Sequence, residues 1–472
     1  MQTLPDAAAT PGDEATSLTA RNCHHWRADL RRDGMRSKKL IAVVALAAGS
    51  AIALLLAAFA TGASQSPGAV AVGSGTASPT KSVCALGTGK KATGKPIKLG
   101  GIAMLIPGVD FTTIGKVAKA YFDCVNDNGG IHGRPIKYTL YTEQLNPAQE
   151  AALARKLIQS DKVVGVVGNT SFAECGVNWK YYQSKGYVVI GAGVQAECFG
   201  TPSIVEANMG PRYSDIGAAQ ALIRAGVKKI AIASPEAISA YADGGVVKLG
   251  KAKNVDVKVF PTHLPVTDAK SQLLQMYQFA GDGNGIIIDF TPDTAPAFMS
   301  AAIALGIVDK IKWGSSTPIA NTFMAGQFPQ FDGHLWINQE FSNLDPSVGP
   351  DTRLMLAVLK KYSPTIAPQA FAQMGFMDGK FATTALLSVK GPVTAKSYNG
   401  AVRKLKNVKT DILCKPWYAY KLPYHIPNNT DITVDYKDGK VVLKEKCFDI
   451  AAVDKELAQT RVWEKKYKLN TG

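Results

Sequence analysis

The sequence predicts an α/β protein in which doubly wound parallel sheets form two lobes. Short apolar segments alternate with segments of helical periodicity between residues 97 and 313, a pattern typical of parallel sheets covered by helices. The chain has 472 residues, and about 400 remain after an N-terminal leader, which is more than one hydrophobic core usually supports. Near the end, two strand-like segments flank Lys437-Asp438-Gly439 and predict a hairpin.

The elements before residue 200 follow from local periodicity. Apolar residues at a spacing of three and four predict a helix over 112–126, and Asn128-Gly129-Gly130 ends it. Asn146-Pro147 opens the next helix, and a third covers 177–185. Strands are predicted over 97–106, 135–141, 163–167 and 187–190.

The same alternation continues through the rest of the chain. Strands are predicted over 229–233, 255–260, 285–289, 311–313, 430–436 and 440–443. Helices are predicted over 216–225, 244–253, 269–280, 296–305, 351–362, 373–389, 395–405 and 451–466.

An export signal is predicted near the N-terminus. Arg36-Ser37-Lys38-Lys39 precedes an apolar run over 40–60, and a stretch rich in Ser, Gly, Ala and Pro follows. The run of about 20 residues is also long enough to span a bilayer, so a retained anchor is the alternative to a cleaved signal. We assign 1–66 to this leader and 67–96 to a linker, and we expect an exported protein in the cell envelope or anchored to the membrane.

The excess of basic over acidic residues does not come from the leader. The chain has 53 Lys and Arg residues and 37 Asp and Glu residues. Seven of the basic and five of the acidic residues fall within residues 1–66, so the remainder has a net charge of +14. A basic exported protein is attracted to anionic cell surfaces. Because the lysines are scattered and no arginine-rich arm occurs, we do not expect nucleic acid as a partner.

Six of the seven cysteines follow the apolar run, an even number that suggests three disulfides in an oxidising compartment. Six cysteines allow fifteen pairings. Proximity favours Cys175–Cys198 and Cys414–Cys447, which leaves Cys84–Cys124. Among these six cysteines no C-x-x-C pair and no neighbouring His occurs, so we expect neither a metal nor a cofactor.

Several segments match enzyme motifs only in part. Residues 89–95 have the spacing of a phosphate-binding loop, but Pro96 replaces the required Ser or Thr. Residues 191–196 match G-x-G-x-x-A, yet residues 197–202 indicate a turn and not the helix that a pyrophosphate would need. Neither G-x-S-x-G nor H-E-x-x-H occurs, so we do not expect an enzyme.

One stretch carries a family resemblance. A helix ending at Asn126 is followed by Gly129-Gly130-Ile131 and Gly133, then by the Asn146-Pro147 helix start and an apolar strand ending at Gly168. This combination resembles periplasmic binding proteins of the branched-chain amino-acid type, the solute receptors of ABC importers. The resemblance covers roughly residues 97–443. Its members commonly have a disulfide corresponding to Cys175–Cys198, in agreement with the spacing.

The resemblance implies a type I periplasmic-binding fold, with two α/β lobes joined by three crossover hinge segments. It places the crossovers near 206–211, 336–341 and 413–420. Lobe one is then expected over 97–208 with 338–412, and lobe two over 209–337 with 413–448. A C-terminal helix or tail covers 449–472. Solute is expected between the lobes, beyond the carboxyl ends of the strands.

The resemblance also implies a set of ligand-binding residues. A zwitterionic solute needs hydroxyls and N–H groups for its carboxylate, an acceptor for its ammonium, and an apolar wall. Each candidate also has an ordinary structural role, such as helix capping for Asp289, core packing for Phe111, or simple surface exposure for Tyr241. The expected ligand-binding residues are Phe111, Asn169, Thr170, Ser171, Gly193, Val194, Tyr241, Asp289 and Thr291.

The sequence departs from the family pattern at one of these positions. Amino-acid binders of the family usually carry Ser or Thr in the loop after the fifth strand, where this chain has Val194-Gln195. One hydroxyl donor to a carboxylate is therefore missing, so amides, urea-like solutes and aromatic acids stand beside amino acids as possible ligands.

The sequence therefore predicts an exported, monomeric solute-binding protein that delivers a small organic molecule to an ABC permease in the membrane. Two alternatives remain open. The same fold presents ligands to membrane signalling partners in a sensor, and an exported hydrolase on an α/β scaffold would turn its substrate over.

Overall fold

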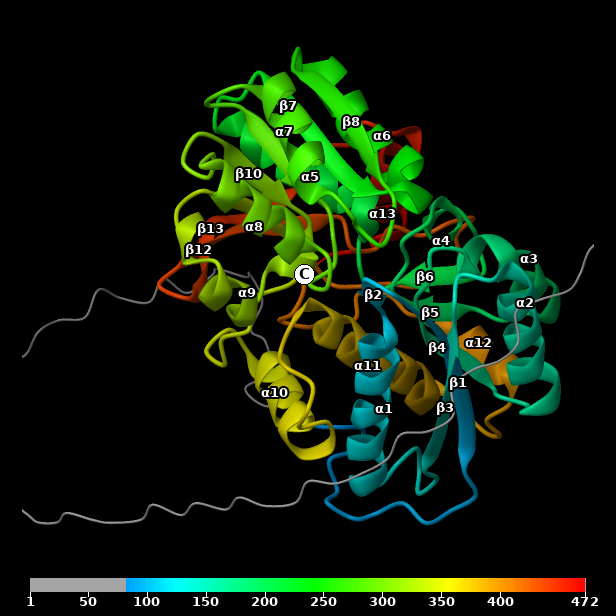
Figure 1. Cartoon of the computed structure of the whole chain (residues 1–472). Helices are drawn as coiled ribbons and strands as arrows, with labels where there is room; N and C mark the ends of the chain where they lie inside the picture. Colours follow the sequence, from blue (N-terminus) through cyan, green and yellow to red (C-terminus); the bar gives the residue numbers. More distant parts are fainter. Residues whose placement is uncertain (1–81, 472) are drawn as a thin grey trace, which may run out of the picture. The chain divides into compact units, whose positions relative to one another are not determined.

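The structure is a computed structural model that describes residues 82–471, and two mixed sheets with their helices account for most of them (Figure 1). The predicted doubly wound α/β fold is confirmed. The predicted export segment lies outside the described residues. Among residues 82–471, none of the helices combines the length and the apolar character that crossing a membrane requires.

The first sheet contains five parallel strands in the order β3-β1-β4-β5-β6, and β2 folds back antiparallel on β1. Its strands are β1 (Ile97–Ile106), β2 (Val109–Asp110), β3 (Ile136–Glu143), β4 (Gly165–Asn169), β5 (Val189–Gly191) and β6 (Ile204–Glu206). The helices between them are α1 (Thr112–Asp127), α2 (Pro147–Arg155), α3 (Glu174–Lys185) and α4 (Ala196–Phe199). The single helical turn α4 stands where the sequence indicated only a turn.

The second sheet has the order β8-β7-β9-β10-β11-β12-β13, in which β12 pairs antiparallel with both of its neighbours, β11 and β13. Its strands are β7 (Lys229–Pro235), β8 (Asp256–Thr262), β9 (Gly285–Ile288), β10 (Lys312–Ser315), β11 (Leu335–Gln339), β12 (Thr430–Lys437) and β13 (Lys440–Asp449). Its helices are α5 (Gly210–Arg224), α6 (Glu236–Lys253), α7 (Ala269–Ala280), α8 (Ala295–Leu305) and α9 (Thr322–Gln327).

The two sheets share one strand order, although the sequence shows no repeat. In each, the second parallel strand lies outside the first, and the following three strands extend on the other side. The order therefore reverses between β1 and β4 in the first sheet and between β7 and β9 in the second. Loops diverge at such a switch point, and ligands of doubly wound proteins bind beyond the strand ends there.

Three connections join the sheets, and Asn428 links all of them. They run from β6 to α5, from β11 to α10 (Pro350–Tyr362), and from α12 (Ala395–Val402) to β12. The buried Asn428 amide on the third connection donates hydrogen bonds to the carbonyls of Ala207 on the first and Glu340 on the second, at 3.3 and 3.2 Å. The lobe boundaries given above stay a prediction.

The core of the first sheet includes helices from late in the sequence. The helix α11 (Ala370–Ser388) lies beside α1 (Figure 1), and both contribute buried apolar side chains to one cluster. Trp417 joins this cluster, stacking on Phe381 with ring centroids 4.0 Å apart, and its indole N–H donates to the Glu206 carbonyl at 2.8 Å.

All three cysteine pairs named above are bonded in the structure. The bonds join Cys84 to Cys124, Cys175 to Cys198, and Cys414 to Cys447. The first ties the segment before β1 to α1, and the third ties the connection that follows α12 to β13. Loops of this size contribute roughly 3 kcal/mol each by restricting the unfolded chain.

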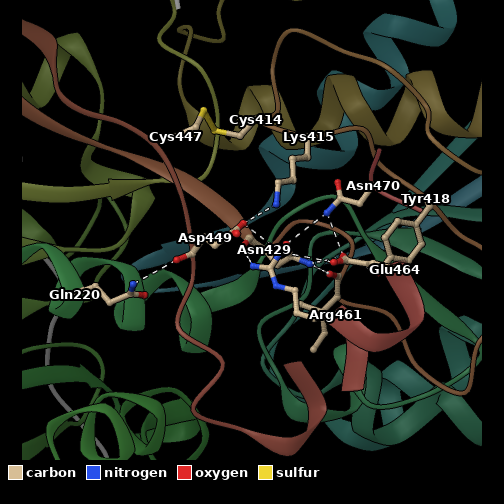
Figure 2. A network of polar contacts seen from close by, with 11 residues as sticks. Gln220, Cys414, Lys415, Tyr418, Asn429, Cys447, Asp449, Arg461, Glu464 and Asn470 are labelled. Carbon is tan, nitrogen blue, oxygen red and sulfur yellow. Dashed lines mark hydrogen bonds and ion pairs between the residues drawn. A yellow bond between two sulfur atoms is a disulfide. The ribbon is translucent and has the colours of Figure 1, made fainter. Parts of the chain in front are cut away.

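The last residues form a polar network around the third connection (Figure 2). Asp449 at the end of β13 pairs with Lys415 at 2.6 Å and with Arg461 of α13 (Lys455–Tyr467) at 3.2 Å. The Glu464 carboxylate of α13 accepts from the Asn429 amide at 2.6 Å, immediately before β12. The C-terminal helix is therefore fixed to a segment that joins the two sheets.

Candidate functional site

A cavity lies where the carboxyl ends of the strands of both sheets meet. The empty space in it, counted together with open solvent at its entrance, is about 540 Å³. The lining residues come from loops after β1, β4 and β5 of the first sheet, from loops after β7, β9, β10 and β11 of the second, and from α5 and α11. The switch points of both sheets therefore contribute to one site.

Phenylalanines form the wall on the side of the first sheet. Phe111, directly before α1, meets Phe172 and Phe371 edge to face, with ring centroids 5.4 and 5.6 Å apart. Ile114 and Met374 continue this wall. Such aromatic pairs are favourable beyond the area that they bury, so the wall offers a firm surface to an apolar or aromatic group.

Asp289 is the charged group at the end of β9. It is 5% exposed and lines the cavity. The Ser316 hydroxyl donates to its Oδ1, and the Asp215 carboxyl lies within hydrogen-bonding reach. Burial raises the pKa of Asp289 to about 6, although both neighbours favour its ionised form.

Glu340 is the second carboxyl of the cavity, and it lies on the connection from β11 to α10. Its Oε2 accepts a hydrogen bond from the Met209 N–H, on the connection that leads into α5. Burial raises the pKa of Glu340 to about 8, and the charge of Asp289 adds to that shift. One side chain therefore lines the cavity and joins two of the three connections between the sheets.

Two hydroxyls beside the cavity bridge a loop of the second sheet to a turn of the first. Thr291 and Thr294, after β9, both donate to the Gly108 carbonyl in the turn between β1 and β2, at 3.0 and 2.8 Å. Gly108 has a φ of +83°, which favours glycine, and a Cβ there would approach the Thr294 hydroxyl to 3.1 Å. We call Thr291, Thr294 and Gly108 the mouth contact.

Replacing both threonines of the mouth contact with valine is expected to weaken solute binding about tenfold, because two hydrogen bonds that form only when the loops meet are lost. The free energy of unfolding of the empty protein should hardly change. Titration calorimetry with a bound solute and urea unfolding measure the two quantities. The exposed Thr365→Val is the matched control, and unchanged affinity in the double variant would contradict a role in closure.

The structure brings five of the predicted ligand-binding residues to the cavity and leaves four outside its lining. Phe111, Thr170, Val194, Asp289 and Thr291 line it. Asn169, Ser171, Gly193 and Tyr241 do not.

The four others have structural partners. The Asn169 side chain accepts from the Ile102 N–H at 2.9 Å, and the Ser171 hydroxyl donates to Glu150 at 2.7 Å. A Cβ on Gly193 would lie 2.4 Å from that of Cys198. The Tyr241 ring lies 5.2 Å from the Arg212 guanidinium.

Other lining residues were not predicted. Glu340 follows an apolar strand within a predicted crossover. Its position just after that strand could have indicated it as a ligand-site residue. Phe172 directly follows the predicted loop Asn169–Ser171, which the same signal could have included. Phe371 and Met374 lie on α11, far beyond that loop in the sequence, and nothing in their local sequence points to the cavity.

One trio of potential metal ligands occurs within residues 82–471, namely Cys175, Cys198 and Glu206. The two sulfurs are bonded to each other, so they are not available as thiolates. Burial raises the pKa of Glu206 well above its usual range, which disfavours the charged carboxylate that a metal needs.

A family model described as "Periplasmic binding protein" matches residues 107–433. No curated protein matches the sequence. Solved structures share the fold. A fatty acid ABC transporter substrate-binding protein from Thermomonospora curvata has 16% identity and a TM-score of 0.67, covering 77% of this chain and 95% of its own.

Two further solved structures have the same fold. A branched-chain amino acid ABC transporter protein from Thermus thermophilus, with bound valine, has 13% identity and a TM-score of 0.66, covering 76% of this chain and 97% of its own. A solute-binding protein from R. palustris, in complex with 4-hydroxybenzoate, has 19% identity and a TM-score of 0.59, covering 76% and 98%.

Proposed function

Because this chain belongs to the periplasmic binding protein family, we propose that it captures a small organic solute in the cavity between its sheets and delivers it to an ABC permease. The family acts outside the cytoplasm, binds small molecules and works with such permeases. It is a family of solute-binding proteins and not of enzymes. The N-terminal apolar run supports export of this chain, by a cleaved signal or with the run kept as an anchor.

The cavity is the observation that carries the proposal. Both sheets line it, hydroxyls bridge its mouth, and the three connections between the sheets meet beside it at Asn428. A solute held there touches both halves of the protein, so it can favour the closed arrangement through contacts that an open one lacks. We propose that closure presents a surface to the permease and that the protein acts as a monomer.

The ligand-binding residues proposed here fall into two groups. Phe111, Thr170, Val194 and Asp289 contact the solute, and Thr291 closes the mouth above it. The second group does not contact the solute but shapes the loops and helices that carry the contacting residues. Its members are Asn169, Ser171, Gly193 and Tyr241.

A thermal-shift screen of the exported protein tests the proposal. The panel contains amino acids, amides, amines, fatty acids, aromatic acids and polyols, and a bound solute raises the melting temperature by mass action. We expect at least one class to stabilise the protein. Turnover of ester or amide substrates by the purified protein would contradict the proposal and favour the hydrolase alternative.

Filling the cavity is expected to abolish that response. Val194 is half-buried on the loop after β5 and lines the cavity, so Val194→Trp places an indole where the solute binds. Affinity should fall at least a hundredfold, measured by calorimetry with the best solute of the screen. Val348→Trp adds the same indole at a position that is 38% exposed and serves as the control. Full binding by Val194→Trp would locate the site elsewhere.

A further inference from the structure

The cavity offers a solute acidic groups and apolar walls but no basic group. Of the described residues that line it, none is Lys, Arg or His, whereas Asp289 and Glu340 both contribute carboxyls. The two are 5% and 3% exposed. A carboxylate or phosphate placed here would meet no counter-charge, and an unpaired charge in an apolar site is costly.

Two more buried acids lie behind the lining. Asp215 of α5 and Asp243 of α6 are fully buried, and the charge of Asp289 acts on both. No Lys or Arg of residues 82–471 forms an ion pair with Asp215, Asp243, Asp289 or Glu340. The nearby Arg212 of α5 is paired with Asp454, at 2.6 Å. The interior around the cavity is therefore acidic, although the chain as a whole is basic.

Two buried acceptors at the cavity lack an N–H or hydroxyl donor, and the Asp215 carboxyl lies close to one of the two residues, Asp289. Oδ2 of Asp289 and Oδ1 of Asn208, a residue only 3% exposed, receive no N–H or hydroxyl hydrogen bond from the residues that the structure describes. Both residues line the cavity. Buried acceptors are nearly always satisfied in native proteins, and because these two oxygens belong to lining residues, a solute that brings hydrogen-bond donors can satisfy them.

The hydroxyls of the lining are largely occupied. Ser316 donates to Asp289, and Thr291 donates to Gly108. Ser214 is 2.9 Å from the Asn338 amide and 3.4 Å from the Thr317 hydroxyl. Among the lining hydroxyls of the described chain, Thr170 alone has no partner. A solute carboxylate would therefore find a single free side-chain hydroxyl and no cationic side chain in the described lining.

From these observations we propose that the solute is an amine, protonated at neutral pH, with an aromatic or branched apolar body and no carboxylate. This inference rests on the proposed function. The ammonium group donates to Asp289 Oδ2 and Asn208 Oδ1, and Glu340 adds a second carboxyl nearby. The apolar body packs against Phe111, Phe172 and Phe371.

Calorimetry with three probes that share one ring tests this class: 2-phenylethylamine, L-phenylalanine and 3-phenylpropionate. We expect the amine to bind at least tenfold more tightly than the amino acid, and the acid not to bind. Asp289→Asn should weaken amine binding at least thirtyfold, while binding of the uncharged 2-phenylethanol changes less than threefold. Glu236→Gln removes an acid that is 67% exposed in its side chain and is the matched control.

The outcomes separate this inference from the proposed function. Equal or tighter binding of 3-phenylpropionate or phenylalanine overturns the amine class, and so does undiminished amine binding by Asp289→Asn. If no arylalkyl or branched alkyl amine binds but another solute of the thermal-shift panel does, the amine class fails and the proposed function stands. If Val194→Trp leaves amine binding intact, the cavity is not the site and both fail.

Discussion

Replacing Asp454 with alanine is expected to lower the free energy of unfolding by about 3–5 kcal/mol, because the buried Arg212 guanidinium then has no counter-ion. The Arg212 side chain is 9% exposed, and its Nε and Nη2 bond both Asp454 oxygens at 2.6 and 2.8 Å. Burial opposes ionisation of Asp454, yet hydrogen bonds from Arg212 and Lys248 outweigh it and hold the pKa of Asp454 below its usual range.

The position of Arg212 adds to this cost. It stands in the first turn of α5, where the helix dipole disfavours a cation that has lost its counter-ion. Gly210 and Pro211 of the same turn line the cavity, so the Asp454→Ala variant should also bind solute more weakly.

Urea unfolding measures this cost. Arg212→Met in the Asp454→Ala background should recover most of the lost free energy, because it removes the unpaired charge. The control Lys415→Met breaks the Lys415–Asp449 pair, whose side chains are 37% and 61% exposed, and should cost less than about 1 kcal/mol. A loss below about 1 kcal/mol for Asp454→Ala would mean that water reaches Arg212 once its partner is gone.

Removing the Trp417 indole is expected to cost a similar amount, about 3–5 kcal/mol for Trp417→Ala. The side chain is fully buried, stacks on Phe381 of α11 and donates to the Glu206 carbonyl at the end of β6. The substitution opens a cavity in the first core and leaves that buried carbonyl without its donor. It also releases part of the third connection, in which Trp417 lies.

A graded series separates the two contributions of Trp417. Trp417→Phe retains a stacked ring but removes the donor, so we expect a loss of about 1 kcal/mol plus a smaller packing cost. Phe323→Ala truncates a ring that is 67% exposed and should change stability by less than about 0.5 kcal/mol. Equal losses for Trp417→Phe and Trp417→Ala would assign the whole effect to the hydrogen bond.

The sheets could be predicted because their inner strands, such as β4 and β9, are buried on both faces and therefore form short apolar runs between helices. The same topology fixes where loops converge, so Thr170 and Asp289 could be expected near a ligand from their position after β4 and β9. These inferences need only local sequence and one rule of strand order.

The rest depends on contacts between distant segments. Tyr241 was expected at the ligand, but its ring lies against Arg212, whose position is set by Asp454 more than 200 residues away. Phe371 and Met374 reach the cavity because α11 packs beside α1, which no local periodicity indicates. The acid-rich interior likewise gathers Asp215, Asp289 and Glu340 from three separate elements.

The mouth contact affects the affinity of the protein for a solute separately from its selectivity among solutes. Thr291 and Thr294 donate to a main-chain carbonyl, and no side chain at position 108 supplies that acceptor. Thr291 also lines the cavity, whereas Thr294 does not, so a change at Thr294 is expected to alter the proposed balance between open and closed forms by one factor for every solute. Selection, natural or in the laboratory, can therefore retune overall affinity at Thr294 without reordering the solutes that the cavity prefers.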